Sequence, residues 1–180
     1  MRLCRVVLVF SLFLPGPVFA QTLFLGAGAG TLWEKSTPGE QGNRWRHGDR
    51  WALGVFAAFP MDSDTRVRLE GVKLPRQITV AGERFRASLE GLTLGVDYLL
   101  LGVFGQTVFG AGLGSYRLNL ERGSPPSGVE GNNFGWYVRV GEWFPVHRRL
   151  YFATEATYHR TSHKGSPQVL VALASLVMRF

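Results

Sequence analysis

The chain has 180 residues, with 20 Lys or Arg against 13 Asp or Glu, and its formal net charge is +7 at pH 7. This length suits a single domain, and no apolar run reaches the roughly 20 residues that a transmembrane helix needs. The single cysteine, Cys4, excludes a framework of intrachain disulfides.

Residues 1–20 have the pattern of a secretory signal peptide: a basic head, a short apolar run and a small residue, Ala20, after which we expect cleavage. The domain to be explained therefore covers residues 21–180, and it loses Cys4 with the signal. Because export separates the chain from nucleic acid, its positive charge favours anionic lipid or polysaccharide as a partner. We expect no nucleic acid partner.

The stretch LFLGAGAGTLW, residues 23–33, carries glycines at every second position. A dinucleotide-binding loop needs a third glycine where this chain has Thr31, and it needs a helix afterwards, whereas loop-like sequence follows here. Alternation instead predicts a strand with Gly26, Gly28 and Gly30 on one face and Leu25 on the other. The same pattern returns in VFGAGLGSYRL, residues 108–118.

Eight segments with the residue alternation of a strand follow one another, and the connections between them alternate between long and short. Alternation of this kind is typical of a membrane β-barrel, whose loops are long on one side and short on the other. The sequence thus predicts an all-β, eight-stranded antiparallel up-and-down transmembrane β-barrel, with strands at residues 22–33, 50–60, 65–74, 87–99, 106–120, 134–145, 149–161 and 167–180.

The last of these segments ends in Phe180, with apolar residues at alternate positions before it. This resembles the C-terminal signature of outer-membrane proteins, and the whole chain resembles the small eight-stranded outer-membrane barrels, the OmpA-like transmembrane domain and its relatives. The resemblance implies insertion by the barrel-assembly machinery through this strand, in a membrane of lipid and lipopolysaccharide. It also implies a protein that often has no enzymatic activity.

Aromatic residues fall near both ends of the predicted strands, as expected of rings at the two membrane–water boundaries. The residues assigned to these rings are Trp33, Trp51, Tyr98, Phe109, Trp136, Trp143, Phe144, Phe152, Tyr158 and Phe180.

Charged residues lie on the opposite faces of the predicted strands, which point into the barrel. A charge at mid-depth on the lipid face costs about 2–4 kcal/mol, and an eight-stranded barrel is just wide enough for side chains to fill. We therefore expect a packed polar interior that forms a plug, and a narrow channel stays open as an alternative. The predicted interior cluster is Arg66, Arg68, Glu70, Asp97, Arg139, Glu155 and His159.

The alternative of a lipid A-modifying hydrolase rests on His159, Ser162 and Glu155. Known lipid A deacylase barrels place His and Ser two residues apart and an acid on the last strand, and this chain has neither feature. A soluble exported barrel with a ligand inside is the remaining alternative. We expect no catalytic residue, cofactor or metal, and a structural, adhesive or envelope-interaction role through loops such as RWRHGDR, residues 44–50, whose arginines suit lipopolysaccharide phosphates.

Overall fold

The computed structural model describes residues 22–35, 45–48, 50–80, 83–102, 105–120, 132–162 and 168–180, and the predicted signal peptide lies outside them. Among the described residues there is no helix long and apolar enough to cross a membrane. The strands are β1 (Phe24–Lys35), β2 (Trp45–His47), β3 (Ala52–Pro60), β4 (Thr65–Val80), β5 (Glu83–Leu101), β6 (Gln106–Leu120), β7 (Asn132–His147), β8 (Leu150–Thr161) and β9 (Gln168–Arg179).

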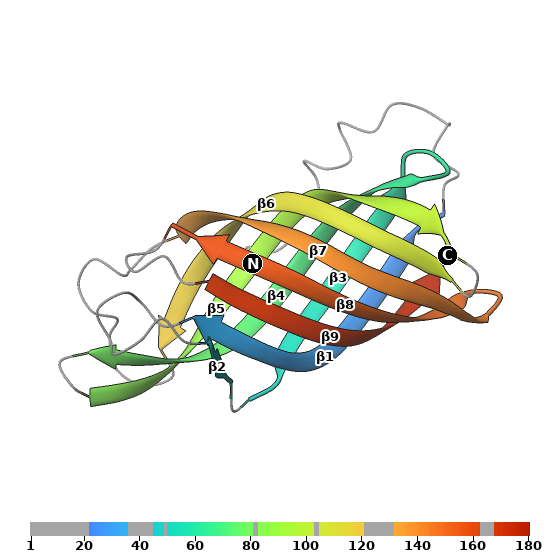
Figure 1. Ribbon diagram of the computed structural model, residues 1–180. Helices are drawn as coiled ribbons and strands as arrows, with labels where there is room; N and C mark the ends of the chain where they lie inside the picture. Colours follow the sequence, from blue (N-terminus) through green and yellow to red (C-terminus); the bar gives the residue numbers. More distant parts are fainter. Residues whose placement is uncertain are drawn as a thin grey trace, which may run out of the picture.

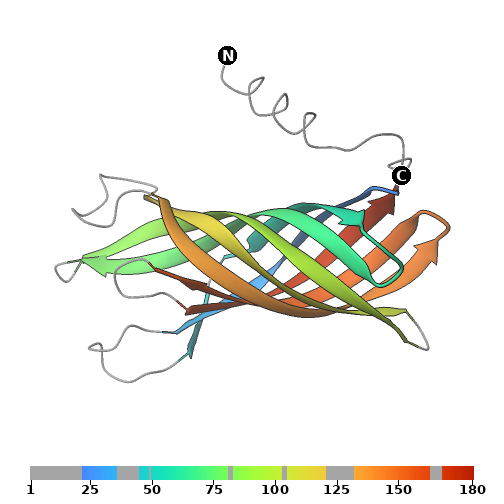
Figure 2. The same ribbon diagram turned by 90° about the horizontal axis from the view of Figure 1, so that it is seen from above.

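The long strands form a closed barrel (Figures 1 and 2). Each long strand pairs antiparallel with the next, in the order β1-β3-β4-β5-β6-β7-β8-β9, and β1 also pairs with β9 over its whole length. Closure leaves the long strands with no free edge along the common wall. The predicted eight-stranded antiparallel barrel is confirmed.

The barrel has two unlike ends. Short connections join β3 to β4, β5 to β6 and β7 to β8, and the C-terminus lies at this end (Figure 2). The connections at the opposite end are longer, apart from the two residues between β4 and β5. We call these the short-turn end and the long-loop end.

The β4–β5 connection is shorter than the sequence predicted. Residues 75–86 were expected as a long loop, but β4 runs to Val80, which pairs with Glu83, so the two strands form a hairpin that extends past their neighbours (Figure 1). The short strand β2 was also not predicted, and it pairs with the end of β1.

The inward glycines lie where a side chain would collide with neighbouring atoms, and several of them make room for aromatic rings inside the barrel. A Cβ at Gly26 would lie 2.3 Å from the ring of Phe56, and Cβ atoms at Gly91 and Gly135 would each lie 2.7 Å from the ring of Tyr116. Such distances are too short for real atoms, so only glycine lets these rings lie against the wall. The spacing read in the sequence is therefore a packing pattern.

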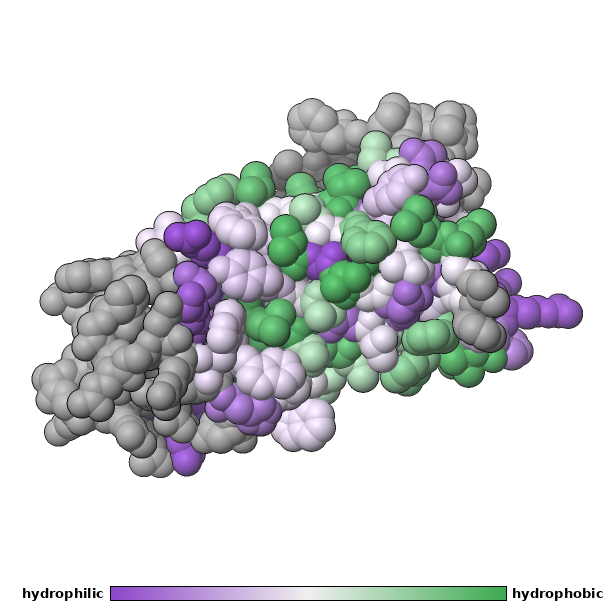
Figure 3. Space-filling model, viewed as in Figure 1, coloured by the Kyte–Doolittle hydropathy of each residue, from purple (hydrophilic) through white to green (hydrophobic). Residues whose placement is uncertain are grey.

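The outward face of the wall is apolar. Figure 3 shows hydrophobic side chains over the middle of the barrel and most hydrophilic ones toward its ends. Such a band would be unfavourable in water, and it suits lipid. Its exposed members include Leu25, Leu53, Val55, Leu92, Leu94, Val96, Leu113, Val138, Val140 and Leu176.

Candidate functional site

A network of buried charges lies in the middle of the barrel. Arg68, from β4, is fully buried, and its two terminal nitrogens donate to the two carboxylate oxygens of Glu155 on β8, at 2.7 and 2.8 Å. This two-bond geometry is the strongest form of a charge-assisted hydrogen bond. Arg68 also donates to Glu70 at 2.9 Å, and its guanidinium lies 3.5 Å from the centre of the Phe56 ring.

Arg139, from β7, completes the network from the opposite wall. It donates to the second oxygen of Glu70 at 2.9 Å, so Glu70 bridges the two arginines. Asp97, from β5, makes longer ion pairs, at 3.7 Å to Arg68 and 4.0 Å to Arg139. Together these contacts tie four strands together across the interior.

An apolar layer fills the barrel between this network and the short-turn end. Arg66 extends into it, with its guanidinium 4.2 Å from the ring centre of Phe24 and 4.7 Å from that of Trp143, and it donates to Gln106 at 2.9 Å. This turn-end apolar layer consists of Phe24, Phe56, Ala58, Leu99, Val108, Trp143, Ala153 and Val177.

Trp143 was expected in the ring of aromatics at the membrane boundary, and that expectation is wrong. The side chain is fully buried, and its Nε1 donates to Glu155 at 2.9 Å. The strand pattern contains the signal that places it, because Trp143 is four residues from the inward Arg139 and therefore on the same face. Its closeness to the strand end was the misleading feature.

A second apolar layer lies between the charges and the long-loop end. His159 lies beside it, and its Nδ1 is 2.8 Å from the hydroxyl oxygen of Tyr116. This loop-end apolar layer consists of Leu32, Ala52, Val72, Leu74, Leu89, Tyr116, Val169, Val171 and Leu173.

The interior is thus layered, with the central ion pairs in the middle, apolar side chains toward each end, and Arg66 as the one buried arginine of the described residues that lies within the turn-end layer. Over the described residues its buried charges balance formally, with three arginines against three carboxylates (Arg66, Arg68 and Arg139; Glu70, Asp97 and Glu155). The structure brings the predicted cluster to the interior, but the expectation of a wholly polar interior is corrected. Bulky apolar and aromatic side chains fill both ends because the glycines opposite them leave the space.

The three residues of the hydrolase alternative do not form a catalytic arrangement. His159 points into the barrel toward Tyr116, whereas Ser162 is exposed and donates to the backbone oxygen of Phe134. Glu155 is held by Arg68 and Trp143. Among the described residues, no group of three or more His, Cys, Asp or Glu could hold a metal ion.

The pair between Tyr116 and His159 leads to a stability prediction. Replacing Tyr116 with Phe keeps the ring over Gly91 and Gly135 but removes the hydroxyl from buried His159, whose Nδ1 then has no such partner. We expect a loss of about 1–3 kcal/mol in the free energy of unfolding. A urea titration of the barrel in lipid vesicles measures it, and an unchanged midpoint would show that this hydrogen bond contributes nothing.

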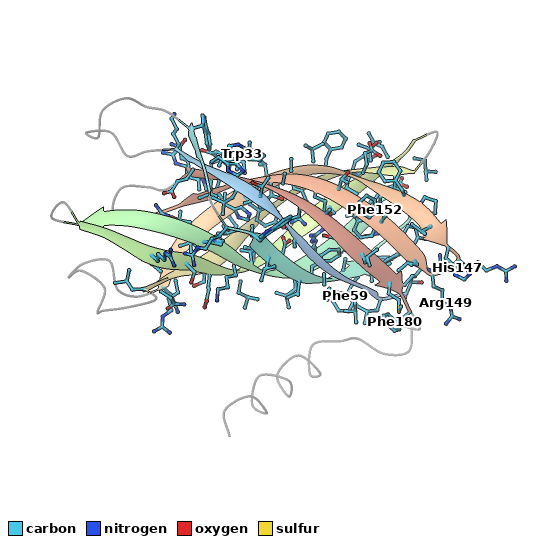
Figure 4. The ribbon with its side chains drawn as sticks, turned by 90° about the horizontal axis from the view of Figure 1, so that it is seen from below. Trp33, Phe59, His147, Arg149, Phe152 and Phe180 are labelled. Atoms are coloured by element: carbon cyan, nitrogen blue, oxygen red, sulfur yellow. The ribbon has the colours of Figure 1, made fainter. Side chains whose placement is uncertain are left out.

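The other predicted aromatics lie on the outer surface or at its margins. Figure 4 shows Trp33 near the long-loop end, and Phe59 and Phe180 near the short-turn end beside His147 and Arg149. Trp51 is 72% exposed, and Trp136 packs against Tyr158 with ring centres 5.5 Å apart. The remaining outward aromatics are Tyr98, Phe109, Phe144 and Phe152.

Basic side chains gather at the long-loop end. Arg86, Arg117 and Arg160 are exposed there, and Arg76 pairs with Glu34 across the gap between β4 and β1. Part of the predicted basic loop, residues 44–50, lies outside the described residues, but the side chain of Arg50 donates to the backbone oxygen of Ala87 at 3.3 Å. Arg50 therefore binds the backbone of the barrel wall, in addition to lying at the long-loop end.

An eight-stranded barrel with an apolar outer band and a filled interior is the architecture of the small outer-membrane β-barrels. No family model matches the chain, and the search of curated proteins found no match. Solved structures do share its fold. Neisserial surface protein A aligns with a TM-score of 0.68 at 13% identity, over 88% of this chain and 97% of that one.

Two further structures align over 89% of this chain. Ail, the attachment invasion locus protein of Yersinia pestis, in complex with the heparin analogue sucrose octasulfate, gives a TM-score of 0.57 at 11% identity over 99% of its length. The N-terminal β-barrel domain of Pseudomonas aeruginosa OprF gives 0.52 at 10% identity over 98% of its length. At these identities the likeness is one of fold.

Proposed function

We propose that this chain is a non-enzymatic, non-conducting β-barrel of the bacterial outer membrane, exported with a signal peptide cleaved after Ala20. Its role is structural or adhesive and is exerted through the long-loop end. The observation that carries the proposal is the filled interior: bulky apolar and aromatic side chains pack on both sides of the central ion pairs, and Arg66 is held between the rings of Phe24 and Trp143. Ions crossing a low-dielectric layer without polar partners face a large desolvation cost.

Several features support the membrane location. The outward band is apolar, aromatic side chains lie toward both margins, and the loops at the two ends differ in length. We further propose that the last strand, which ends in the exposed Phe180, is read by the barrel-assembly machinery during insertion. Lipopolysaccharide is the proposed partner of the basic long-loop end, since guanidinium groups match phosphate geometry.

The rival functions receive less support from the same residues. A narrow channel requires the charges to face a water path, whereas the central ion pairs lie between the two apolar layers and Arg66 is packed against the rings of Phe24 and Trp143. A hydrolase requires a nucleophile beside a base, whereas Ser162, just after β8, is exposed and donates to the backbone of Phe134, and His159 points inward to Tyr116. A soluble ligand-carrying barrel requires a polar exterior, and this exterior is apolar.

The test is conductance in a planar lipid bilayer. We expect the purified barrel, shown to be folded by faster gel migration before boiling, to insert and give no unit conductance steps. Trp143→Ala is the positive control. It removes a large side chain from the turn-end apolar layer, leaves the outer band unchanged and is expected to give conductance steps. Conductance steps from the unmodified chain would overturn the sealed-barrel proposal. Failure of the chain to co-fractionate with outer membranes would overturn the location.

A further inference from the structure

The outward face of the barrel carries a notch near the long-loop end. It is an open hollow of about 270 Å³ on the wall of β3, β4 and β5, lined by Leu53, Val55 and Gly71, with Lys73 and Glu90 also in its lining. We call it the Gly71 notch. Its floor is apolar, and its charged members lie on the side toward the long-loop end.

Gly71 differs from the other strand glycines that the structure describes. Those others face inward, where an added Cβ would lie under 3 Å from other atoms, whereas a Cβ at Gly71 would meet only Val55, at an ordinary 3.6 Å. Packing inside the protein therefore does not require glycine at this position. A glycine within a strand costs stability and often marks a place where a ligand approaches closely.

The walls of the notch are suited to an acyl chain. Gly71 pairs with Val55 on one side and Leu92 on the other, and each of these side chains is 60% exposed. The backbones of β3 and β5 lie about 10 Å apart, which is twice the usual strand spacing. The missing side chain between them leaves a short apolar furrow over Gly71, lined on β3 by Leu53 and Val55 and bounded on β4 by Lys73.

The rim supplies the complementary charge. Lys73, Glu90 and Arg117 are paired in one row across β4, β5 and β6, so the row has one more cation than anion. The Lys73 side chain is 57% exposed, and its ammonium lies 3.6 Å from Glu90, whose other oxygen accepts from Asn119 at 2.7 Å. Trp51, next to β3 and exposed, lies at the same end of the wall.

We propose that the Gly71 notch is a lipid-binding site, which seats one acyl chain of a phosphorylated outer-leaflet lipid over Gly71 and binds its phosphate at Lys73. An apolar furrow below an exposed cationic rim matches an amphiphile whose charge lies at the membrane boundary. The inference rests on the proposed outer-membrane location, and it goes beyond that function by assigning a specific lipid site to the barrel wall.

Native mass spectrometry of the folded chain, released from detergent with lipid A added, tests the site. Gly71→Leu fills the furrow, and we expect it to retain lipid A about tenfold more weakly, as expected for a displaced apolar contact. Ala174→Leu adds similar bulk to the outward face of β9, and it is expected to bind like the unmodified chain. Faster gel migration before boiling shows that each variant is folded.

The charge requirement is tested with two further variants. We expect Lys73→Gln to weaken binding of bisphosphorylated lipid A severalfold and to leave dephosphorylated lipid A unaffected. Glu90→Gln, which frees Lys73 from its ion pair, is expected to strengthen it. The same variants are also measured with phosphatidylglycerol in place of lipid A. Equal retention of lipid A by all folded variants, or the same pattern of retention across the variants for phosphatidylglycerol as for lipid A, would overturn the site while leaving the proposed barrel function intact. An unfolded or soluble unmodified chain would overturn the proposed function itself.

Discussion

Replacing Glu155 with Gln is expected to lower the free energy of unfolding by about 3–5 kcal/mol, because it removes the carboxylate that binds Arg68 most closely and leaves the buried network with one more cation than anion. The carboxylate of Glu155 accepts from both terminal nitrogens of Arg68 and from the indole of Trp143. An amide of the same shape supplies one oxygen and one donor. The new amide N–H then faces an N–H donor of Arg68. The apolar side chains around the pair exclude the water that could otherwise accept a hydrogen bond from either group.

The measurement is a reversible urea titration into lipid vesicles, followed by tryptophan fluorescence and by gel migration without boiling. Glu90→Gln is the matched control, since Glu90 makes its ion pair at the surface, where such pairs contribute about 0–1 kcal/mol. A loss below about 1 kcal/mol for Glu155→Gln, no larger than the control, would show that the central network contributes little to stability.

A second variant separates the ion pair from a general packing defect. Arg68→Gln combined with Glu155→Gln removes both charges of the closest pair, and the combined loss is expected to be smaller than the sum of the two single losses. Glu70 limits this recovery, because it also accepts from Arg68 and from Arg139. Strict additivity of the two single losses would contradict a direct coupling between Arg68 and Glu155.

The orientation of residues was readable from the sequence, because alternate residues of a strand face opposite sides. This rule placed Arg68, Glu70 and Arg139 inside and Leu25 on the opposite, outward face. The same rule applied strictly would have placed Trp143 inside. The error came from assigning its role by depth along the strand, which the sequence determines less sharply than the face.

The pairing of the interior charges was not readable in the same way. Arg68 and Glu155 are 87 positions apart and lie on strands that are not neighbours. Which inward side chains meet across a barrel depends on the stagger between all the strands, and a single sequence does not state this stagger. The layering of the interior depends on the same stagger, so only the presence of inward charges was predicted.

The ends of the strands were predicted least well where the barrel core stops. The β4–β5 hairpin continues past Ala87, the last residue of β5 toward this end that pairs with β6. Beyond that point β5 pairs with β4 alone among the described strands. The sequence there does alternate, as in Gln77-Ile78-Thr79-Val80, but Pro75 and Gly82 are turn-forming residues that favour a loop.

The second large effect is expected from Gly112, which lies inside the barrel under Tyr137. A Cβ at this position would lie 2.4 Å from the backbone oxygen of Leu94, 2.6 Å from the ring of Tyr137 and 2.7 Å from the Cα of Gly95. Two of these neighbours are backbone atoms of the adjacent strand, so the clash is not relieved by turning a flexible side chain. We expect Gly112→Val to lose about 3 kcal/mol or more, at or above the usual cost of overpacking.

The control for this prediction is Gly71→Val on the same kind of strand. Its Cβ meets only Val55 at 3.6 Å, so a β-branched residue fits there, and in a strand it should be neutral or stabilising. Comparing the two urea midpoints separates the need for space inside the wall from the general effect of replacing a strand glycine. Equal losses for the two variants would mean that the inward glycines do not serve ring packing. A large loss for Gly112→Val alone would show that an inward glycine is required where the backbone of the adjacent strand and the ring of Tyr137 leave no room for a side chain.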